Sequence, residues 1–202
     1  RFSKLIADRF DCRVIGIEPS DKMRAKAEQN IPDGRICFLK GDACHLPLPD
    51  QSCTHAWLSM VIHHIPNLAD CAKELTRVLP KDGLIFIRNA FKENLEDICM
   101  YRYFPRTLAI DAQRLPEISH VTNVFEELGF SFVSHEVIDQ VIDNSFREHI
   151  DRLRQRGIST LELLSDQEFE QGLRNMENAC PAMDPAKPIS EKIDLLVFRN
   201  TA

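Results

Sequence analysis

Short apolar runs alternate with helical patterns along the first half of this 202-residue chain. The runs have the length of buried strands. We therefore predict strands at residues 13–17, 36–39, 56–61 and 84–87. Helices are predicted between them at 21–30 and 68–79, and in the second one apolar side chains recur with a period of 3.6 residues. Strands separated by amphipathic helices indicate an α/β fold, with a mostly parallel sheet and helices on both faces.

Polar residues at the predicted helix ends support this assignment. Ser20 precedes the helix at 21–30 and Asn67 precedes the helix at 68–79. Serine and asparagine both favour the N-cap position, where the side chain accepts a hydrogen bond from the first helical turn. Pro80 and Gly83 end the second helix before the next strand begins.

The second half of the chain has a less regular pattern. Residues 118–128 form an amphipathic helix, and the runs at 130–138 and 193–198 are predicted strands. A charged helix is predicted at 145–157. The stretch Ser165-Asp166-Gln167-Glu168 has the spacing of a capping box, which predicts the start of a further helix.

Length and composition exclude several classes of protein. The length suits one well-cored domain. A net charge of −6 argues against nucleic acid as the main partner, since that requires a basic face. No apolar run approaches the ~20 residues that span a bilayer, so no membrane partner is expected. The seven cysteines form no C-x-x-C pair, which is typical of reduced thiols in a cytoplasmic protein, and their spacing with histidine predicts no metal site.

Three polar side chains stand where predicted strands end: Glu18, Asp42 and Ser59. Because the carboxyl ends of parallel strands meet at one edge of the sheet, where ligands bind, we expect these residues to line a cofactor edge. A carboxylate at Glu18 can accept hydrogen bonds from both hydroxyls of a ribose. Asp42 can accept one from an adenine amine, while the backbone N–H of Ala43 donates to the ring.

The motifs "VIGIEPSDKM", "GDACHLPLPD", "SMVIHHI" and "ELTRVLPKDGLIFI" resemble consecutive motifs of class I S-adenosylmethionine-dependent methyltransferases. They are most similar to the small-molecule group that includes the ubiquinone and menaquinone C-methyltransferases. The resemblance implies a Rossmann-like fold with an antiparallel C-terminal strand, S-adenosylmethionine as cofactor and S-adenosylhomocysteine as product. It implies that Glu18 binds the ribose, that Met23 packs beside the adenine, that Asp42 and Ala43 bind the adenine, and that Ser59 lies near the methionine moiety.

The glycine-rich loop that ends the family's first strand is absent from the sequence. "RFSKLIADRF" resembles the helix that follows this loop, so the family's first strand is absent as well. We therefore expect a longer native protein that has lost its N-terminus, and a sheet that lacks its central strand. Such a chain would lack the backbone groups that hold the methionine end of the cofactor.

Acceptor binding is predicted for segments that leave the strand ends. His63 and His64 follow Ser59 and are candidates for a catalytic base, or for packing at the start of the next helix. Tyr101, Arg102 and Tyr103 are candidates for contact with a flat or anionic substrate, or for packing under a lid. A single domain at residues 1–202 is expected, with a cofactor-binding half at 1–90 and helical substrate or lid elements at 91–118 and 143–188. A homodimer surface is the competing explanation for the second helical stretch.

Three functions are consistent with the sequence. The first is an enzyme, a methyltransferase that acts on a small molecule by in-line displacement, in which the protein chiefly positions the two reactants. The second is a catalytically inactive, methyltransferase-like binding or regulatory protein. The third is an NAD(P)-dependent oxidoreductase, which explains Glu18 but gives no reason for the Asp42-Ala43 pair.

Overall fold

The computed structural model describes residues 2–202, apart from the side chains of residues 96 and 97. The strands in this range are β1 (Val14–Ile17), β2 (Ile36–Leu39), β3 (His55–Ser59), β4 (Leu84–Asn89), β5 (Phe130–Asp143) and β6 (Ile189–Asn200). All of the predicted strands are present. β5 continues to Asp143 and β6 begins at Ile189, so both strands extend beyond the predicted runs at 130–138 and 193–198.

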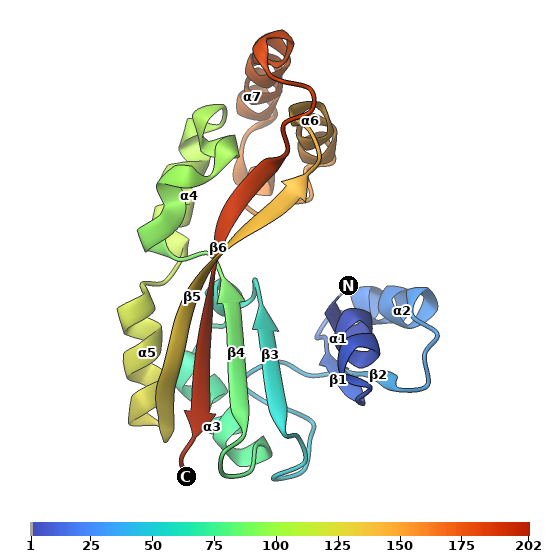
Figure 1. Cartoon of the computed structure of the whole chain (residues 1–202), viewed down its shortest axis with the longest axis vertical. Helices are drawn as coiled ribbons and strands as arrows, with labels where there is room; N and C mark the ends of the chain where they lie inside the picture. The colour runs from blue at the N-terminus through green and yellow to red at the C-terminus, as the bar shows by residue number, and fades with distance from the viewer. Residues whose placement is uncertain (1) are drawn as a thin grey trace.

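The strands form a two-stranded sheet, β1-β2, and a four-stranded sheet in the order β3-β4-β6-β5 (Figure 1). β1 and β2 are parallel, as are β3 and β4. β6 runs antiparallel to both of its neighbours, β4 and β5. The predicted α/β fold with an antiparallel C-terminal strand is therefore confirmed, whereas the strand pairing is mixed rather than mostly parallel, with two parallel and two antiparallel pairs.

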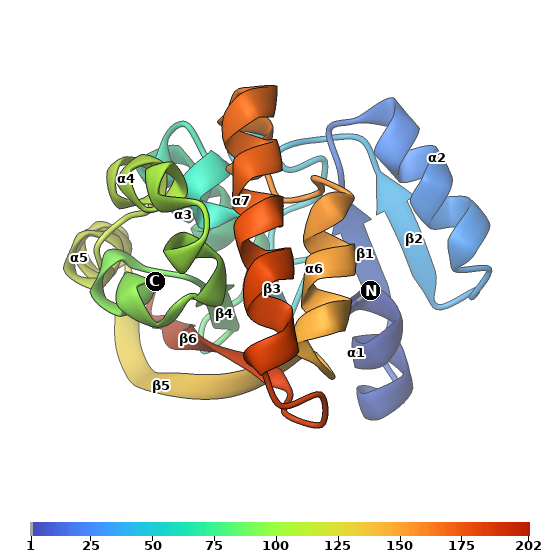
Figure 2. The same ribbon diagram turned by 90° about the horizontal axis from the view of Figure 1, so that it is seen from above.

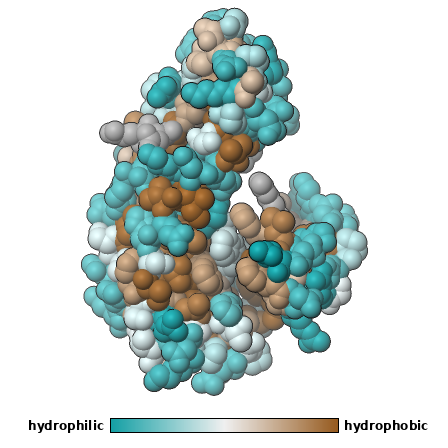
Figure 3. Space-filling view, in the orientation of Figure 1, coloured by the Kyte–Doolittle hydropathy of each residue, from teal (hydrophilic) through white to brown (hydrophobic). Residues whose placement is uncertain are grey.

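The sheet is divided between β1 and β3. Within residues 2–202 no strand pairs β1 with β3. The helix α1 (Phe2–Phe10) lies beside this division, and its Leu5 and Phe10 are 56% and 71% exposed. The ring of Phe2 reaches that of Trp57 in β3, with 5.4 Å between centroids. In Figure 3 the two-stranded unit stands apart from the main body across a cleft with apolar residues on both sides.

The longer helices after α1 are α2 (Asp21–Asn30), α3 (Leu68–Val78), α4 (Pro105–Arg114), α5 (Ile118–Glu127), α6 (Phe146–Arg154) and α7 (Asp166–Ala179). The short 3₁₀ helices are η1 (Ile62–His64), η2 (Lys92–Asp97), η3 (Cys99–Arg102), η4 (Leu161–Leu163) and η5 (Cys180–Ala182). The three predicted N-caps are confirmed: Ser20 caps α2, Asn67 caps α3, and Ser165 forms a capping box with Glu168 at α7.

The first hydrophobic core lies between the four-stranded sheet and the helices α3 and α5. Ile85 and Ile87 of β4 and Phe198 of β6 are fully buried in it, together with Phe125 of α5. Along β4, the buried Ile85 and Ile87 alternate with partly buried side chains, as expected for a strand with one well-covered face. Burial of such side chains stabilises the fold by ~1.5–3 kcal/mol each.

A second hydrophobic core joins the segments 91–118 and 143–188, which we call the helical cap. Its buried side chains include Phe104, Ile150, Leu161 and Met176, which come from both segments. Figures 1 and 2 show α6 and α7 side by side beyond the end of β5 and β6. Its role as a lid or as a dimer surface stays a prediction. No helix of residues 2–202 is long and apolar enough to cross a membrane.

Candidate functional site

Glu18 directly follows β1 and is partly buried. Its backbone N–H donates to the carbonyl of Leu39, at the end of β2, over 3.1 Å. Its Oε1 accepts a hydrogen bond from the backbone N–H of Ser20 over 2.9 Å. Oε2 forms no hydrogen bond with the described part of the chain. One oxygen thus holds the carboxylate against the start of α2, and the other is free for a ligand.

Asp42 lies on the loop after β2, beside Glu18 in the sheet order. Its Oδ1 accepts a hydrogen bond from the backbone N–H of Cys44 over 2.8 Å and lies 3.3 Å from Nδ1 of His45. Oδ2 has no partner among residues 2–202. Ala43 packs against the first core. The two carboxylates therefore each present one free oxygen from neighbouring strand ends, as a ribose and an adenine amine require.

The loop after Asp42 is held by a clamp from α3. Arg77 donates to the carbonyls of Leu46 and Leu48 over 3.0 and 2.7 Å. Glu74 accepts a hydrogen bond from the backbone N–H of Leu46 over 2.7 Å, and it pairs with Arg77 over 2.8 Å. The Arg77 guanidinium holds the pKa of Glu74 below its usual range, so this carboxylate stays ionised. The clamp fixes the loop to a helix of the first core.

The side chain of Met23 is exposed, whereas that of Ser59 is hydrogen-bonded. Met23 lies in the first turn of α2 and is 54% exposed, which leaves its side chain free to cover a ligand. Ser59 ends β3, and its hydroxyl accepts a hydrogen bond from Nη1 of Arg88 over 3.1 Å. Arg88 also contacts Gln140 and lies over the ring of Phe2. The roles predicted for Met23 and Ser59 in cofactor binding stay predictions.

His63 and His64 lie on η1 with their rings in contact at a tilt of 46° and 4.1 Å between ring centroids. His63 is half-buried, whereas His64 is exposed. Burial, followed by the neighbouring His64, lowers the pKa of His63, although Asn89 favours its charged form. The Nδ1 atom of His63 is buried without a partner in the described part of the chain. A neutral imidazole with a free ring nitrogen is the form that a general base needs.

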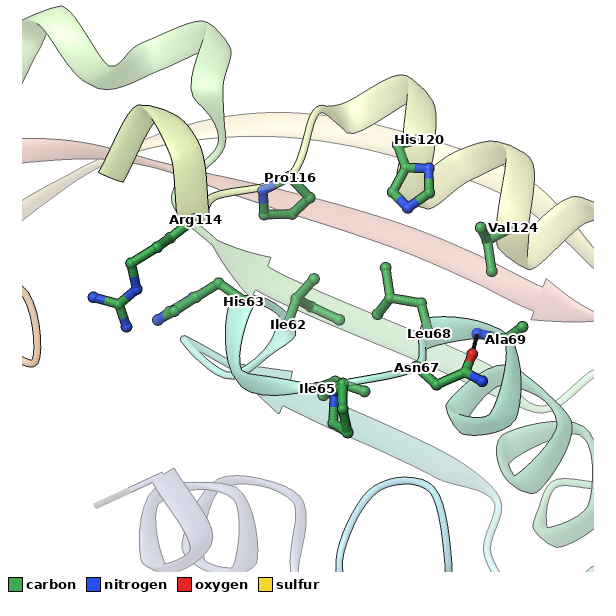
Figure 4. Close-up of a pocket in the computed structure, with 11 residues that line it drawn as sticks. Ile62, His63, Ile65, Asn67, Leu68, Ala69, Arg114, Pro116, His120 and Val124 are labelled. Atoms are coloured by element: carbon green, nitrogen blue, oxygen red, sulfur yellow. Dashed lines mark hydrogen bonds between the residues drawn. The ribbon is translucent and has the colours of Figure 1, made fainter. Parts of the chain in front are cut away.

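A cavity of about 420 Å³ adjoins His63 (Figure 4). Its lining comes from η1, the start of α3, the end of α4, and α5. The lining residues are Ile62, His63, Ile65, Pro66, Asn67, Leu68, Ala69, Arg114, Pro116, His120 and Val124. Figure 4 shows the side chains of His63 and Arg114 converging at one end of this cavity. The sequence did not predict Arg114 and His120, which lie more than fifty residues from His63; α5 packs on α3 and carries His120, and Arg114 ends α4 just before α5.

The predicted substrate residues Tyr101, Arg102 and Tyr103 lie in the helical cap. The hydroxyl of Tyr101 is buried and donates to Oδ2 of Asp111 over 2.9 Å. Burial raises the pKa of Tyr101 well above its usual range. Tyr103 packs on Phe146, with 5.6 Å between centroids, and Arg102 is exposed. Tyr101 therefore has a structural partner already, and contact of any of the three with an acceptor stays a prediction.

Comparison of sequences finds a matching family model and several curated relatives. Residues 1–87 match the family model described as "Methyltransferase domain". The chain is 31% identical over 84 residues to demethylmenaquinone methyltransferase of Chlamydia felis; the match covers 42% of this chain and 36% of that protein. The chain thus matches about a third of the length of this curated relative.

Comparison of structures extends the likeness to nearly the whole chain. A structure titled as a putative methyltransferase from an antibiotic biosynthesis pathway of Anabaena variabilis has a TM-score of 0.72 and 19% identity, over 96% of this chain and 85% of that one. A phosphoethanolamine N-methyltransferase of Haemonchus contortus, in complex with phosphomonomethylethanolamine and S-adenosylhomocysteine, has a TM-score of 0.61 and 16% identity, over 98% of this chain and 46% of that one. Both show the same fold.

Proposed function

We propose that this chain, which has the class I methyltransferase fold and matches the methyltransferase-domain family over residues 1–87, transfers a methyl group from S-adenosylmethionine to a small-molecule acceptor. The observation that carries the proposal is the pair of free carboxylate oxygens on Glu18 and Asp42. A neighbour of the same fold is solved with S-adenosylhomocysteine. Bound at this edge, the cofactor supplies an electrophilic methyl group.

Four residues of this chain have a role in the proposed cofactor site. Glu18 accepts hydrogen bonds from the ribose hydroxyls, Asp42 accepts one from the adenine amine, and Met23 covers the adenine. Ser59, at the end of β3, lies near the methionine moiety. In-line transfer needs the two reactants to be aligned, and such positioning is worth ~7–11 kcal/mol of the barrier.

His63 is the proposed base where the acceptor carries a proton on its reactive atom. Its lowered pKa keeps the imidazole neutral near pH 7, and its side chain lines a cavity in which an acceptor hydroxyl or amine could give up its proton. His64, exposed on the same short helix, is the second candidate. Acceptors that react without losing a proton need neither residue.

Calorimetric titration of S-adenosylhomocysteine tests the proposal, with NADH as the comparison ligand. The wild-type chain should bind S-adenosylhomocysteine and not NADH. Glu18→Ala should weaken binding by ~1–3 kcal/mol, the usual cost of losing hydrogen bonds to a charged group. Glu18→Gln, which keeps the shape and removes the charge, should fall between the two. An unchanged affinity in a folded Glu18→Ala variant would remove Glu18 from the site.

Two other functions are separated by the same experiment. Binding of NADH in place of S-adenosylhomocysteine would favour the oxidoreductase. Binding of S-adenosylhomocysteine without turnover of S-adenosylmethionine over a broad panel of acceptors would favour the inactive, methyltransferase-like protein. A cytoplasmic location and a homodimer remain part of the proposal, and sedimentation analysis tests the dimer.

A further inference from the structure

The cavity beside His63 has a positively charged side chain in its lining, although the protein as a whole is acidic. Among its lining side chains Arg114 carries a fixed positive charge, His63 and His120 are imidazoles, and none is acidic. The chain as a whole carries a net charge of −6. The remaining lining is largely apolar, with Ile62 and Leu68 between the basic groups (Figure 4). The cavity is thus apolar with a cationic end.

Arg114 forms no ion pair with the described part of the chain. Its Nη1 and Nη2 instead donate to the hydroxyls of Thr160 and Ser159, each over 3.3 Å. A guanidinium carries five N–H donors, so three remain for a ligand. By contrast, Arg77 and Arg156 are neutralised by carboxylates.

The nearest buried acid does not neutralise Arg114 directly. Asp111 lies one turn earlier on α4 and is almost fully buried. Its Oδ1 accepts a hydrogen bond from Thr160 over 2.6 Å, and its Oδ2 accepts one from Tyr101 over 2.9 Å. Thr160 stands between the two charges, since it accepts from Arg114 and donates to Asp111. This chain of contacts holds the guanidinium in place and leaves its free donors unpaired.

The cavity adjoins the residues proposed for the cofactor. His63 lies four positions after Ser59, on the helix that follows β3. The carbonyl of Asn67, another lining residue, lies 3.5 Å from Sγ of Cys44, two positions after Asp42. A molecule in the cavity would therefore lie next to the cofactor edge.

We infer that this cavity binds an organic acid, with its carboxylate on Arg114 and its apolar body against the aliphatic lining. The planar guanidinium fits a carboxylate through two parallel hydrogen bonds, which makes arginine the usual residue for this task. The volume of about 420 Å³ suits a small organic molecule. The identification of this acid as the methyl acceptor rests on the proposed function. The binding of a carboxylate in the cavity is independent of it.

The test is calorimetric titration of the full chain with 2-naphthoate and with 2-naphthamide, its uncharged analogue. Wild type should bind the naphthoate roughly tenfold or more tightly than the amide. Arg114→Gln should weaken naphthoate binding by roughly ten- to a hundredfold, the effect of losing a charged hydrogen bond. Arg114→Lys, which keeps the charge without the planar group, should lie between. The matched control is Arg106→Gln on the same helix, where Arg106 pairs with Glu168 outside the cavity.

The outcomes separate the two proposals. Equal binding of naphthoate and naphthamide by wild type, or an equal loss in the Arg106 control, would overturn the carboxylate site. S-adenosylhomocysteine is titrated into the same variants and should bind all of them alike. Selective naphthoate binding by a chain that does not bind S-adenosylhomocysteine would support the carboxylate site and refute methyl transfer.

Discussion

The clamp between Arg77 and the loop after Asp42 gives a prediction that joins stability to cofactor binding. Arg77→Met removes the guanidinium and keeps the aliphatic part of the side chain, so packing on α3 is largely preserved. The carbonyls of Leu46 and Leu48 lose the guanidinium as a donor, and Glu74 loses its cation. The loop that carries Asp42 should then become mobile.

The expected loss follows from the separate contacts of Arg77. Its ion pair with Asp50 adds at most ~1 kcal/mol, because Asp50 is 77% exposed. The bonds to the two loop carbonyls are partly buried and come from a charged donor, so together they contribute about 2–3 kcal/mol after the carbonyls regain water. A total near 3 kcal/mol corresponds to a fall in Tm of roughly 6–12 °C for a chain of this size.

Cofactor affinity should fall with stability, because binding must then order the loop. Ordering the backbone of a single loop residue costs about 1–2 kcal/mol, which already corresponds to a loss of roughly 5- to 30-fold in affinity for S-adenosylhomocysteine. Thermal unfolding and calorimetric titration measure the two effects. Arg106→Met, which removes an ion pair from the helical cap, is the control and should leave the affinity unchanged. A destabilised Arg77→Met protein with wild-type affinity would refute the reasoning.

Three further predictions follow from packing and protonation. His63→Ala should leave S-adenosylhomocysteine binding intact and lower kcat with a proton-bearing acceptor by ~10²-fold or more; an unchanged kcat would contradict its role as base. Gly172→Ala gains ~1 kcal/mol of helix propensity. Its new Cβ would stand 2.2 Å from the Phe104 ring, a clash that costs ~1–3 kcal/mol; urea unfolding should show a net loss, and a gain would contradict this packing. Burial lowers the pKa of His149, so stability should fall as pH drops below its unfolded value of about 6.5. Glu191, whose pKa burial raises, opposes this trend, so Tm is compared with His149→Gln, and an equal slope would contradict the prediction.

Features that depend on neighbouring residues were predicted well from the sequence. Ser20, Asn67 and Ser165 cap their helices because the cap is a contact over two or three residues. The extension of β5 beyond Ile138 was missed. There the strand carries Asp139 and Gln140 on an exposed ribbon, so no apolar pattern marks it, and pairing with β6 alone defines it.

The candidate site likewise contains residues that the sequence predicts and residues that it does not. The positions of Glu18 and Asp42 after β1 and β2 were predicted correctly because strand ends can be located from the sequence, and their binding roles stay predictions. Arg114 could not be found, since its position beside His63 depends on how α4 and α5 pack on the sheet. Tyr101 was a candidate for substrate contact or for packing under a lid, and the structure gives its hydroxyl a buried partner, Asp111, ten residues further along the chain. Side-chain partners at such separations are set by tertiary packing.

The helical segment 144–188 leaves the β5–β6 ribbon at Asp143 and returns at Ile189, which is paired with it across the two strands. Paired residues in an antiparallel ribbon stand only ~5 Å apart. An insert whose two ends nearly touch can change in length or sequence without shifting the register of the strands that carry it. Evolution can therefore exchange this segment as a cassette, and an engineer can graft a homologous one at the same two residues, while the strand ends that bear Glu18 and Asp42 keep their positions.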